Sequence, residues 1–189
     1  MTIPFPTIET KRLLLRELVP TDADALYAIH SDIEGMRWYG ADTMTEPSQA
    51  TKLIELFASW RRLANPGTRW GIERREDARL IGTCGLFSWN ANSRSCALGF
   101  ELARDAWGGR YMAETLNAVL SHGWETMQLN RIGAQVHPSN TLSLRLLIGL
   151  GFQFEGRLRQ IARWNGVQHD LMQLSLLRDE APDLAESRR

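Results

Sequence analysis

The chain has 189 residues, of which 43% are apolar and 23% charged, a composition typical of a soluble globular domain. Lysine plus arginine and aspartate plus glutamate balance at 22 each, so no bulk positive charge indicates a nucleic-acid partner. No window approaches the roughly 18 uninterrupted apolar residues of a membrane span, and the first residues lack the pattern of a signal peptide. We therefore expect one cytoplasmic domain at 10–178, a polar tail at 179–189, and a small-molecule or protein substrate.

Apolar periodicity and turn residues divide the chain into strands and helices. The predicted strands cover residues 11–19, 68–75, 79–89, 95–103, 131–136, 152–164 and 167–177. The first predicted helix begins at Thr21. The other predicted helices cover residues 46–64, 112–127 and 139–150. This order predicts an α/β (α+β) fold with one mixed, mostly antiparallel sheet and helices on both faces.

Local signals refine four of these elements. Thr21 is the expected N-cap of the first helix. The helix at 46–64 has an apolar stripe expected to pack in the core, consisting of Leu53, Phe57, Trp60 and Leu63. Cys84 and Cys96 lie in strand-like runs without a CxxC pair or a nearby histidine, so we interpret both as reduced core thiols.

A glycine-rich turn separates the strand at 95–103 from the helix at 112–127. Gly108 and Gly109 leave the turn without bulky side chains where the first helical N–H groups lack partners. Such a place is suited to an anion, and phosphate is the obvious ligand. The same arrangement occurs in α/β proteins that bind nothing there, so a purely structural role stays open.

Five sequence blocks surround this turn: TKRLLLRELVPTDADAL at 10–26, IGTCGL at 81–86, WGGRYMAE at 107–114, RIGAQVHPSNTLSLRLLIGLGFQFEG at 131–156 and RWNGVQHDLMQLSLL at 163–177. Together they resemble the GNAT N-acetyltransferase superfamily, in particular its ribosomal-protein N-terminal acetyltransferase-like (RimJ/RimL-type) branch. The resemblance implies the GNAT fold, in which the fourth and fifth strands splay into a cleft that holds acetyl-CoA as co-substrate. It further implies that no metal takes part, and a homodimer is common in the family.

The resemblance places the coenzyme's pyrophosphate on the glycine-rich turn. The matching positions are Trp107, Gly108, Gly109, Arg110, Tyr111 and Met112. The family motif has a glycine where this chain has Arg110 and a small residue where it has Met112. Either the turn shifts so that the two glycines approach the phosphates and Arg110 adds charge, or the affinity for CoA is reduced. Alternatively, Arg110 is a solvated surface residue.

The resemblance also assigns the rest of the coenzyme. Its pantetheine arm would pair with the main chain of the fourth strand at Phe100, Glu101, Leu102 and Ala103. Asn140 would bind the pantetheine as well, unless it only starts the helix that follows it.

The chemistry requires a group that takes a proton from the amine and a group that protonates the departing thiolate. Glu101 is the first candidate base, because it interrupts an apolar run where the strands would part and because burial would raise its pKa. It could instead face solvent. His137 is the second candidate base, and a plain loop histidine is its alternative interpretation.

The proton donor that many GNAT enzymes use is a tyrosine, and this chain has Leu147 at that position. The resemblance suggests that Ser143 takes its place near the CoA sulfur. Spacing of three residues puts Asn140 and Ser143 on one helix face. Ser143 could also be a small packing residue.

These assignments predict an acetyl-CoA-dependent N-acetyltransferase that acts by direct attack in a ternary complex. The acceptor is an amine, either a protein N-terminal α-amino group or a small molecule. Trp38, Tyr39 and the turn at 164–166 could line its groove, although core packing explains them equally well. The main alternative is a GNAT-fold sensor or scaffold that binds acyl-CoA without turnover. A dinucleotide-dependent oxidoreductase is poorly supported, because residues 11–28 contain no glycine.

Overall fold

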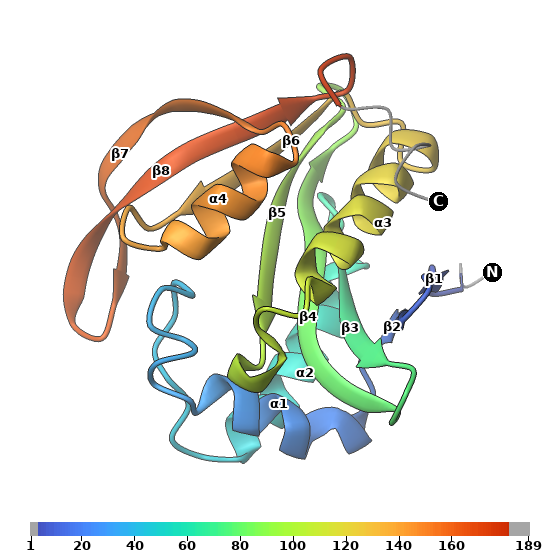
Figure 1. Ribbon diagram of the computed structural model, residues 1–189, viewed down its shortest axis with the longest axis vertical. Coiled ribbons are helices and arrows are strands. Elements are labelled where there is room, and N and C mark those ends of the chain that lie inside the picture. The colour runs from blue at the N-terminus through green and yellow to red at the C-terminus, as the bar shows by residue number, and fades with distance from the viewer. Residues whose placement is uncertain (1–3, 182–189) are drawn as a thin grey trace.

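A computed structural model of the chain describes residues 4–181 and contains one eight-stranded sheet with four α-helices (Figure 1). The strands are β1 (Ile8–Glu9), β2 (Leu13–Glu17), β3 (Thr68–Arg74), β4 (Arg79–Asn90), β5 (Ser95–Leu102), β6 (Arg131–Val136), β7 (Gln153–Trp164) and β8 (Val167–Leu177). The α-helices are α1 (Ala23–His30), α2 (Ser48–Trp60), α3 (Tyr111–Glu125) and α4 (Thr141–Gly149). Two short 3₁₀ turns, η1 (Pro20–Asp22) and η2 (Arg104–Ala106), precede α1 and α3.

The strands lie in the order β1-β2-β3-β4-β5-β6-β8-β7, and every neighbouring pair except one is antiparallel. This confirms the predicted mixed, mostly antiparallel sheet. The short strand β1 was not predicted, because two residues carry no periodic signal. The Asn165-Gly166 turn between β7 and β8 has positive φ at both residues, as a type I′ hairpin turn requires.

The parallel pair, β5 and β6, is joined over only part of its length. Pairing runs from Ser95 with Arg131 to Leu98 with Ala134 and then stops. Beyond that point, residues 99–102 of β5 have no partner on the β6 side, and β6 diverges together with β8 and β7 (Figure 1). This separation is the splayed cleft that the sequence resemblance implied.

Helices cover both faces of the sheet, as predicted. The cores show this: Leu26 of α1 and Phe57 of α2 share one buried cluster, whereas Leu116 of α3 and Leu147 of α4 belong to another. Side chains along β4 alternate between these faces. Phe87 contacts Trp60 of α2, whereas its neighbour Leu86 reaches Gly123 of α3. Within residues 4–181, no helix is long and apolar enough to span a membrane.

Two local predictions were wrong. Thr21 is not an N-cap: η1 intervenes, and the buried Asp22 precedes α1 while its carboxylate accepts hydrogen bonds from Val19 N–H and from Arg16. Leu63 is not in the core, because α2 ends at Trp60 and the Leu63 side chain is 54% exposed. Of the predicted polar tail at 179–189, residues from 182 onward lie outside the described residues.

Gly82 allows β4 to approach β5 closely at the edge of the cleft. A Cβ at this position would meet backbone atoms of Glu101 and would lie 3.0 Å from Leu102 Cα. Because backbone cannot move aside as a side chain can, we expect Gly82→Ala to lower the free energy of unfolding by about 2 kcal/mol. Urea denaturation measures this change. Gly149→Ala is the matched control, since nothing lies within 4 Å of a Cβ there, and equal losses in both variants would contradict the prediction.

Candidate active site

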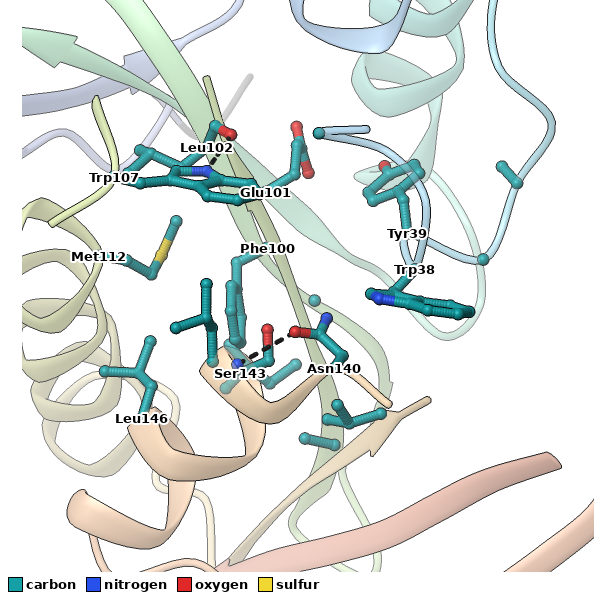
Figure 2. Close-up of a pocket in the computed structure, with 18 of the residues that line it drawn as sticks. Trp38, Tyr39, Phe100, Glu101, Leu102, Trp107, Met112, Asn140, Ser143 and Leu146 are labelled. Atoms are coloured by element: carbon teal, nitrogen blue, oxygen red, sulfur yellow. Dashed lines mark hydrogen bonds between the residues drawn. The ribbon is translucent and has the colours of Figure 1, made fainter. Parts of the chain in front are cut away.

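A pocket of about 740 Å³ lies where β5 and β6 separate (Figure 2). Its walls come from both faces of the sheet and form two halves, named here for the helices beside them. The α3 half is lined by residues 106–108 and 110–113, by Phe100, and by Asn140, Leu142, Ser143 and Leu146 at α4. Gly109 is not among the lining residues. The α2 half is lined by Trp38 and Tyr39, by Leu53, Leu56, Phe57 and Trp60 of α2, and by Phe87. Glu101 lies between the two halves (Figure 2).

The α3 half contains the predicted glycine-rich turn. Gly108 has φ +77°, and Arg110, the N-cap of α3, has φ 59° in the left-handed region. The family's glycine would adopt this conformation freely, whereas arginine adopts it at an energetic cost. The Arg110 side chain is exposed, and the first-turn amides of α3 lack intrahelical partners. The turn therefore offers main-chain N–H groups and a guanidinium to an anion.

A network from the start of the chain holds this turn in place. The Glu114 carboxylate accepts hydrogen bonds from Thr10 Oγ1 at 2.6 Å, Arg12 N–H at 2.9 Å and Arg12 Nε at 2.7 Å. Arg12 also donates to the Gly109 carbonyl at 3.0 Å, and its guanidinium lies 4.4 Å from the centre of the Tyr111 ring. Sequence reasoning missed this network, because its members lie about 100 residues apart.

The free edge of β5 presents backbone groups of alternate residues to the cleft. Ala103 N–H donates to the Ile81 carbonyl on the β4 side, so Ala103 cannot offer that group to a ligand. By alternation, Phe100 and Leu102 direct their backbone groups toward the cleft. The Leu102 carbonyl already accepts the Trp107 indole N–H at 2.9 Å. Phe100 is thus the residue whose main chain is best placed to pair with an extended ligand.

Asn140 and Ser143 share the first turn of α4 at the pocket wall. Asn140 is the N-cap, and its Oδ1 accepts the Ser143 N–H at 3.2 Å. The structure therefore shows the capping role, and the Asn140 side-chain amide still faces the pocket. The Ser143 hydroxyl points toward the Phe100 ring (Figure 2). Leu147, at the usual tyrosine position, is fully buried.

Glu101 is buried and surrounded by polar groups. Arg69 and the Thr83 hydroxyl both donate hydrogen bonds to its carboxylate, and His30 Nε2 lies 3.4 Å from Oε1. Arg69 also donates to the Tyr39 hydroxyl at 3.4 Å. Burial alone would raise the pKa of Glu101, but the Arg69 charge and the contacts with His30 and Thr83 outweigh it and hold that pKa below its ordinary value. The expectation of a raised pKa for Glu101 was therefore wrong.

His137, the second candidate base, takes part in an aromatic stack. Its ring lies 3.9 Å from Trp38 at an interplanar angle of 11°, and its Nδ1 accepts the Ser139 N–H at 3.1 Å. Trp164 stacks on His169 at 3.6 Å and lies edge-on to His137. Burial lowers the pKa of His137. Among the described residues, 4–181, His137 is not one of those that line the pocket.

The hairpin turn at 164–166 contacts the loop that lines the α2 half. Trp164 Nε1 donates to the Arg37 carbonyl at 3.3 Å, and Asn165 N–H donates to Asp42 Oδ1 at 2.5 Å. Within residues 4–181, Leu146 is the last residue in the sequence that lines the pocket, so the hairpin itself is not part of the pocket wall. Of the aromatic residues considered for an acceptor groove, Trp38 and Tyr39 line the pocket, whereas Trp164 supports the loop that carries them.

The cysteines lie outside this chemistry. Cys84 and Cys96 are free and buried, as expected of core thiols, and burial raises the pKa of each to about 12. Among residues 4–181, no group of three or more His, Cys, Asp or Glu side chains could hold a metal ion.

Comparisons with known proteins identify the family. Residues 12–153 match the acetyltransferase (GNAT) domain family. The uncharacterized N-acetyltransferase YoaA of Bacillus subtilis (strain 168) is 38% identical over 174 residues, which cover 92% of this chain and 98% of the relative. The chain therefore belongs to the GNAT family and is an acetyltransferase enzyme.

Solved structures show the same fold. Mycobacterium smegmatis RimJ in complex with CoA-disulfide superposes with a TM-score of 0.85 at 23% identity, covering 97% of this chain and 95% of that one. Spermidine N-acetyltransferase from Vibrio cholerae, in complex with CoA and spermine, gives a TM-score of 0.77 at 20% identity, covering 90% of this chain and 98% of that one.

The buried pair of Arg69 and Glu101 makes a prediction about stability. Glu101→Gln leaves the Arg69 guanidinium buried without a counter-charge, and we expect the free energy of unfolding to fall by about 3 kcal/mol at pH 7. Urea denaturation of both proteins across pH measures the difference. Because the pKa of Glu101 is lower in the folded state, its contribution is present at neutral pH and is lost as the pH falls below about 4.3.

The difference between wild type and Glu101→Gln should thus be constant from pH 6 to 8 and shrink in acid. A difference that appears only above pH 7 would contradict the lowered pKa. The variant Thr83→Val is a milder control, because it removes the hydrogen bonds of Thr83 with Arg69 and Glu101 but leaves the Arg69 charge paired with Glu101.

Proposed function

We propose that this protein transfers the acetyl group of acetyl-CoA to a primary amine by direct attack within a ternary complex. The observation that carries the proposal is the continuous pocket at the separation of β5 and β6. It joins an anion-binding turn in the α3 half to a second half on the other face of the sheet. Two substrates can therefore meet at Glu101 and Phe100 without either one displacing the other.

The α3 half fits the coenzyme. Main-chain amides at Gly108, Gly109 and the start of α3, with Arg110 beside them, bind the pyrophosphate. The pantetheine arm follows the free edge of β5 at Phe100, and the Asn140 side-chain amide binds it from the other side. Trp107, Tyr111 and Met112 complete the wall of this half.

Transfer requires a neutral amine whose nitrogen forms a bond to the thioester carbonyl carbon while the carbon–sulfur bond breaks. We assign Glu101 to attract the acceptor's ammonium group and to take its proton, directly or through a water molecule. Since the pKa of Glu101 is low, it stays ionised throughout the neutral range, and the amine's own pKa governs the rise of rate with pH. The Ser143 hydroxyl supplies the proton that the departing thiolate takes, and solvent restores it.

The test is release of free CoA from acetyl-CoA in the presence of small amines and of peptides with free N-termini, with the acetylated acceptor identified by mass spectrometry. We expect stoichiometric release of CoA and formation of an amide. Saturable binding of acetyl-CoA with no release to any acceptor would instead support the non-catalytic acyl-CoA-binding role.

Ser143→Ala tests the proton donor. The bond from Ser143 to Asn140 uses the main-chain N–H, so the cap of α4 survives the substitution. We expect kcat to fall at least tenfold while the Kd for acetyl-CoA changes less than twofold. Ser139→Ala is the control, since Ser139 lies beside α4 and outside the pocket lining. An unchanged kcat in Ser143→Ala would remove Ser143 from the mechanism.

Arg110→Gly tests whether Arg110 supplies charge to the phosphates. Glycine keeps the left-handed conformation and removes the guanidinium. We expect the Kd for acetyl-CoA to rise about tenfold at low salt and less at high salt, as calorimetry would measure. Arg94→Gly is a matched control, because Arg94 is another exposed arginine with positive φ, 48°, outside the pocket lining. Tighter binding in Arg110→Gly would show that Arg110 obstructs the turn.

A further inference from the structure

The α2 half of the pocket has walls built mostly of apolar side chains. Its lining includes Trp38, Leu53, Leu56, Phe57, Trp60 and Phe87. The residues come from three segments, the loop before α2, α2 itself and β4, which meet only in the folded chain. Nothing in the glycine-rich turn or in the coenzyme half accounts for this surface. It therefore bears on the other substrate.

The aromatic rings of this wall are held in fixed positions. Phe57 and Trp60 meet edge to face with centroids 4.9 Å apart, and Trp60 lies 5.4 Å from Phe87. Two glycines make room for the rings: a Cβ at Gly67 would lie 2.9 Å from Phe87 Cβ, and one at Gly99 would lie 3.0 Å from Phe87 Cε1. A wall with rings locked in this way is preorganised to bind an apolar group.

The charged side chains of the α2 half offer little attraction to a ligand that carries more than one cationic group. Among the described lining residues on this side, the charged ones are Glu34, Arg69 and Glu101. Arg69 and Glu101 neutralise each other, and Glu34 lies at the solvent edge with a side chain that is 65% exposed. A polyamine with several ammonium groups would leave all but one of them against apolar side chains, which is costly.

We propose that the α2 half selects a primary amine that carries an apolar, preferably aromatic, group. This inference rests on the proposed function and names its acceptor class. The amine nitrogen lies at Glu101, and the apolar group packs against Phe57, Trp60 and Phe87.

This chemistry occurs in two sources, an arylalkylamine and a peptide whose first residue is large and apolar. The assay compares 2-phenylethylamine and a hexapeptide beginning with phenylalanine with spermidine and a hexapeptide beginning with aspartate, at saturating acetyl-CoA. We expect kcat/KM for at least one of the first two to exceed that of spermidine and of the acidic peptide by tenfold or more. Which of the two is preferred identifies the source.

The variant Leu56→Glu introduces a carboxylate into the wall. Leu56 is 49% exposed, so the change does not bury a charge or threaten the fold. We expect kcat/KM for 2-phenylethylamine to fall at least fivefold and that for spermidine to rise, with the KM for acetyl-CoA unchanged. Leu63→Glu is the matched control, because Leu63 is 54% exposed just beyond α2 and outside the pocket lining. It should leave all three parameters as they are in wild type.

A binding measurement separates failure of this inference from failure of the proposed function. Titration of 2-phenylethylamine into the CoA-loaded protein, followed by tryptophan fluorescence, reports on the α2 half without turnover. Saturable binding that Leu56→Glu weakens and Leu63→Glu does not supports the inference even if no acetylation is seen. Tighter binding of spermidine than of 2-phenylethylamine overturns it while leaving acetyl transfer intact. Absence of acetyl-CoA binding overturns the proposed function instead.

Discussion

The buried guanidinium of Arg69 is the constraint on which the centre of the molecule depends. It lies under β4 and β5, where it donates to Thr83 at 2.6 Å, to the Gly99 carbonyl at 3.1 Å and to Glu101. So large a side chain fits there because two neighbouring residues are glycines without side chains. A Cβ at Gly85 would lie 2.7 Å from Arg69 Cδ, and a Cβ at Gly99 would lie 3.2 Å from Arg69 Nη1. Burying a charge is costly unless it is paired, so the arginine and Glu101 stabilise each other in one arrangement. Glu101 is thereby fixed where the strands part.

The two halves of the pocket are built by different means. The α3 half depends on main-chain groups: the turn at Gly108, the first amides of α3 and the free edge of β5 at Phe100. Arg12 supports this half by donating a hydrogen bond to the Gly109 carbonyl, so this supporting contact is also made to the main chain. The α2 half consists of side chains from α2 and neighbouring segments. Under the proposed function, the backbone half holds the coenzyme and the side-chain half holds the acceptor, so substitutions in the side-chain half can change the acceptor without altering the coenzyme site.

Much of the fold could be predicted from the sequence, because strands and helices depend on local periodicity; the strand at Arg131–Val136 was predicted with the bounds observed. The glycine-rich turn was found from its local residues, whereas the coenzyme role of Asn140 was implied by the family resemblance. Effects that need a distant partner were not: the direction of the pKa shift of Glu101 depends on Arg69, and the role of Arg12 depends on a glutamate about 100 residues away. A signal for Arg69 did exist, since glycines within strands often mark the close approach of a bulky neighbour.

The contacts between the β7–β8 hairpin and the loop that carries Trp38 bear on the order in which a nascent chain acquires its site. That loop lacks helix or strand, and Trp164 and Asn165 hold it by bonds to Arg37 and Asp42. During synthesis the loop emerges well over a hundred residues before its support. This part of the pocket wall therefore reaches its final shape only after the last strands leave the ribosome, and a chain truncated before Trp164 would keep every lining residue yet lack the contacts that hold the loop with Trp38 and Tyr39.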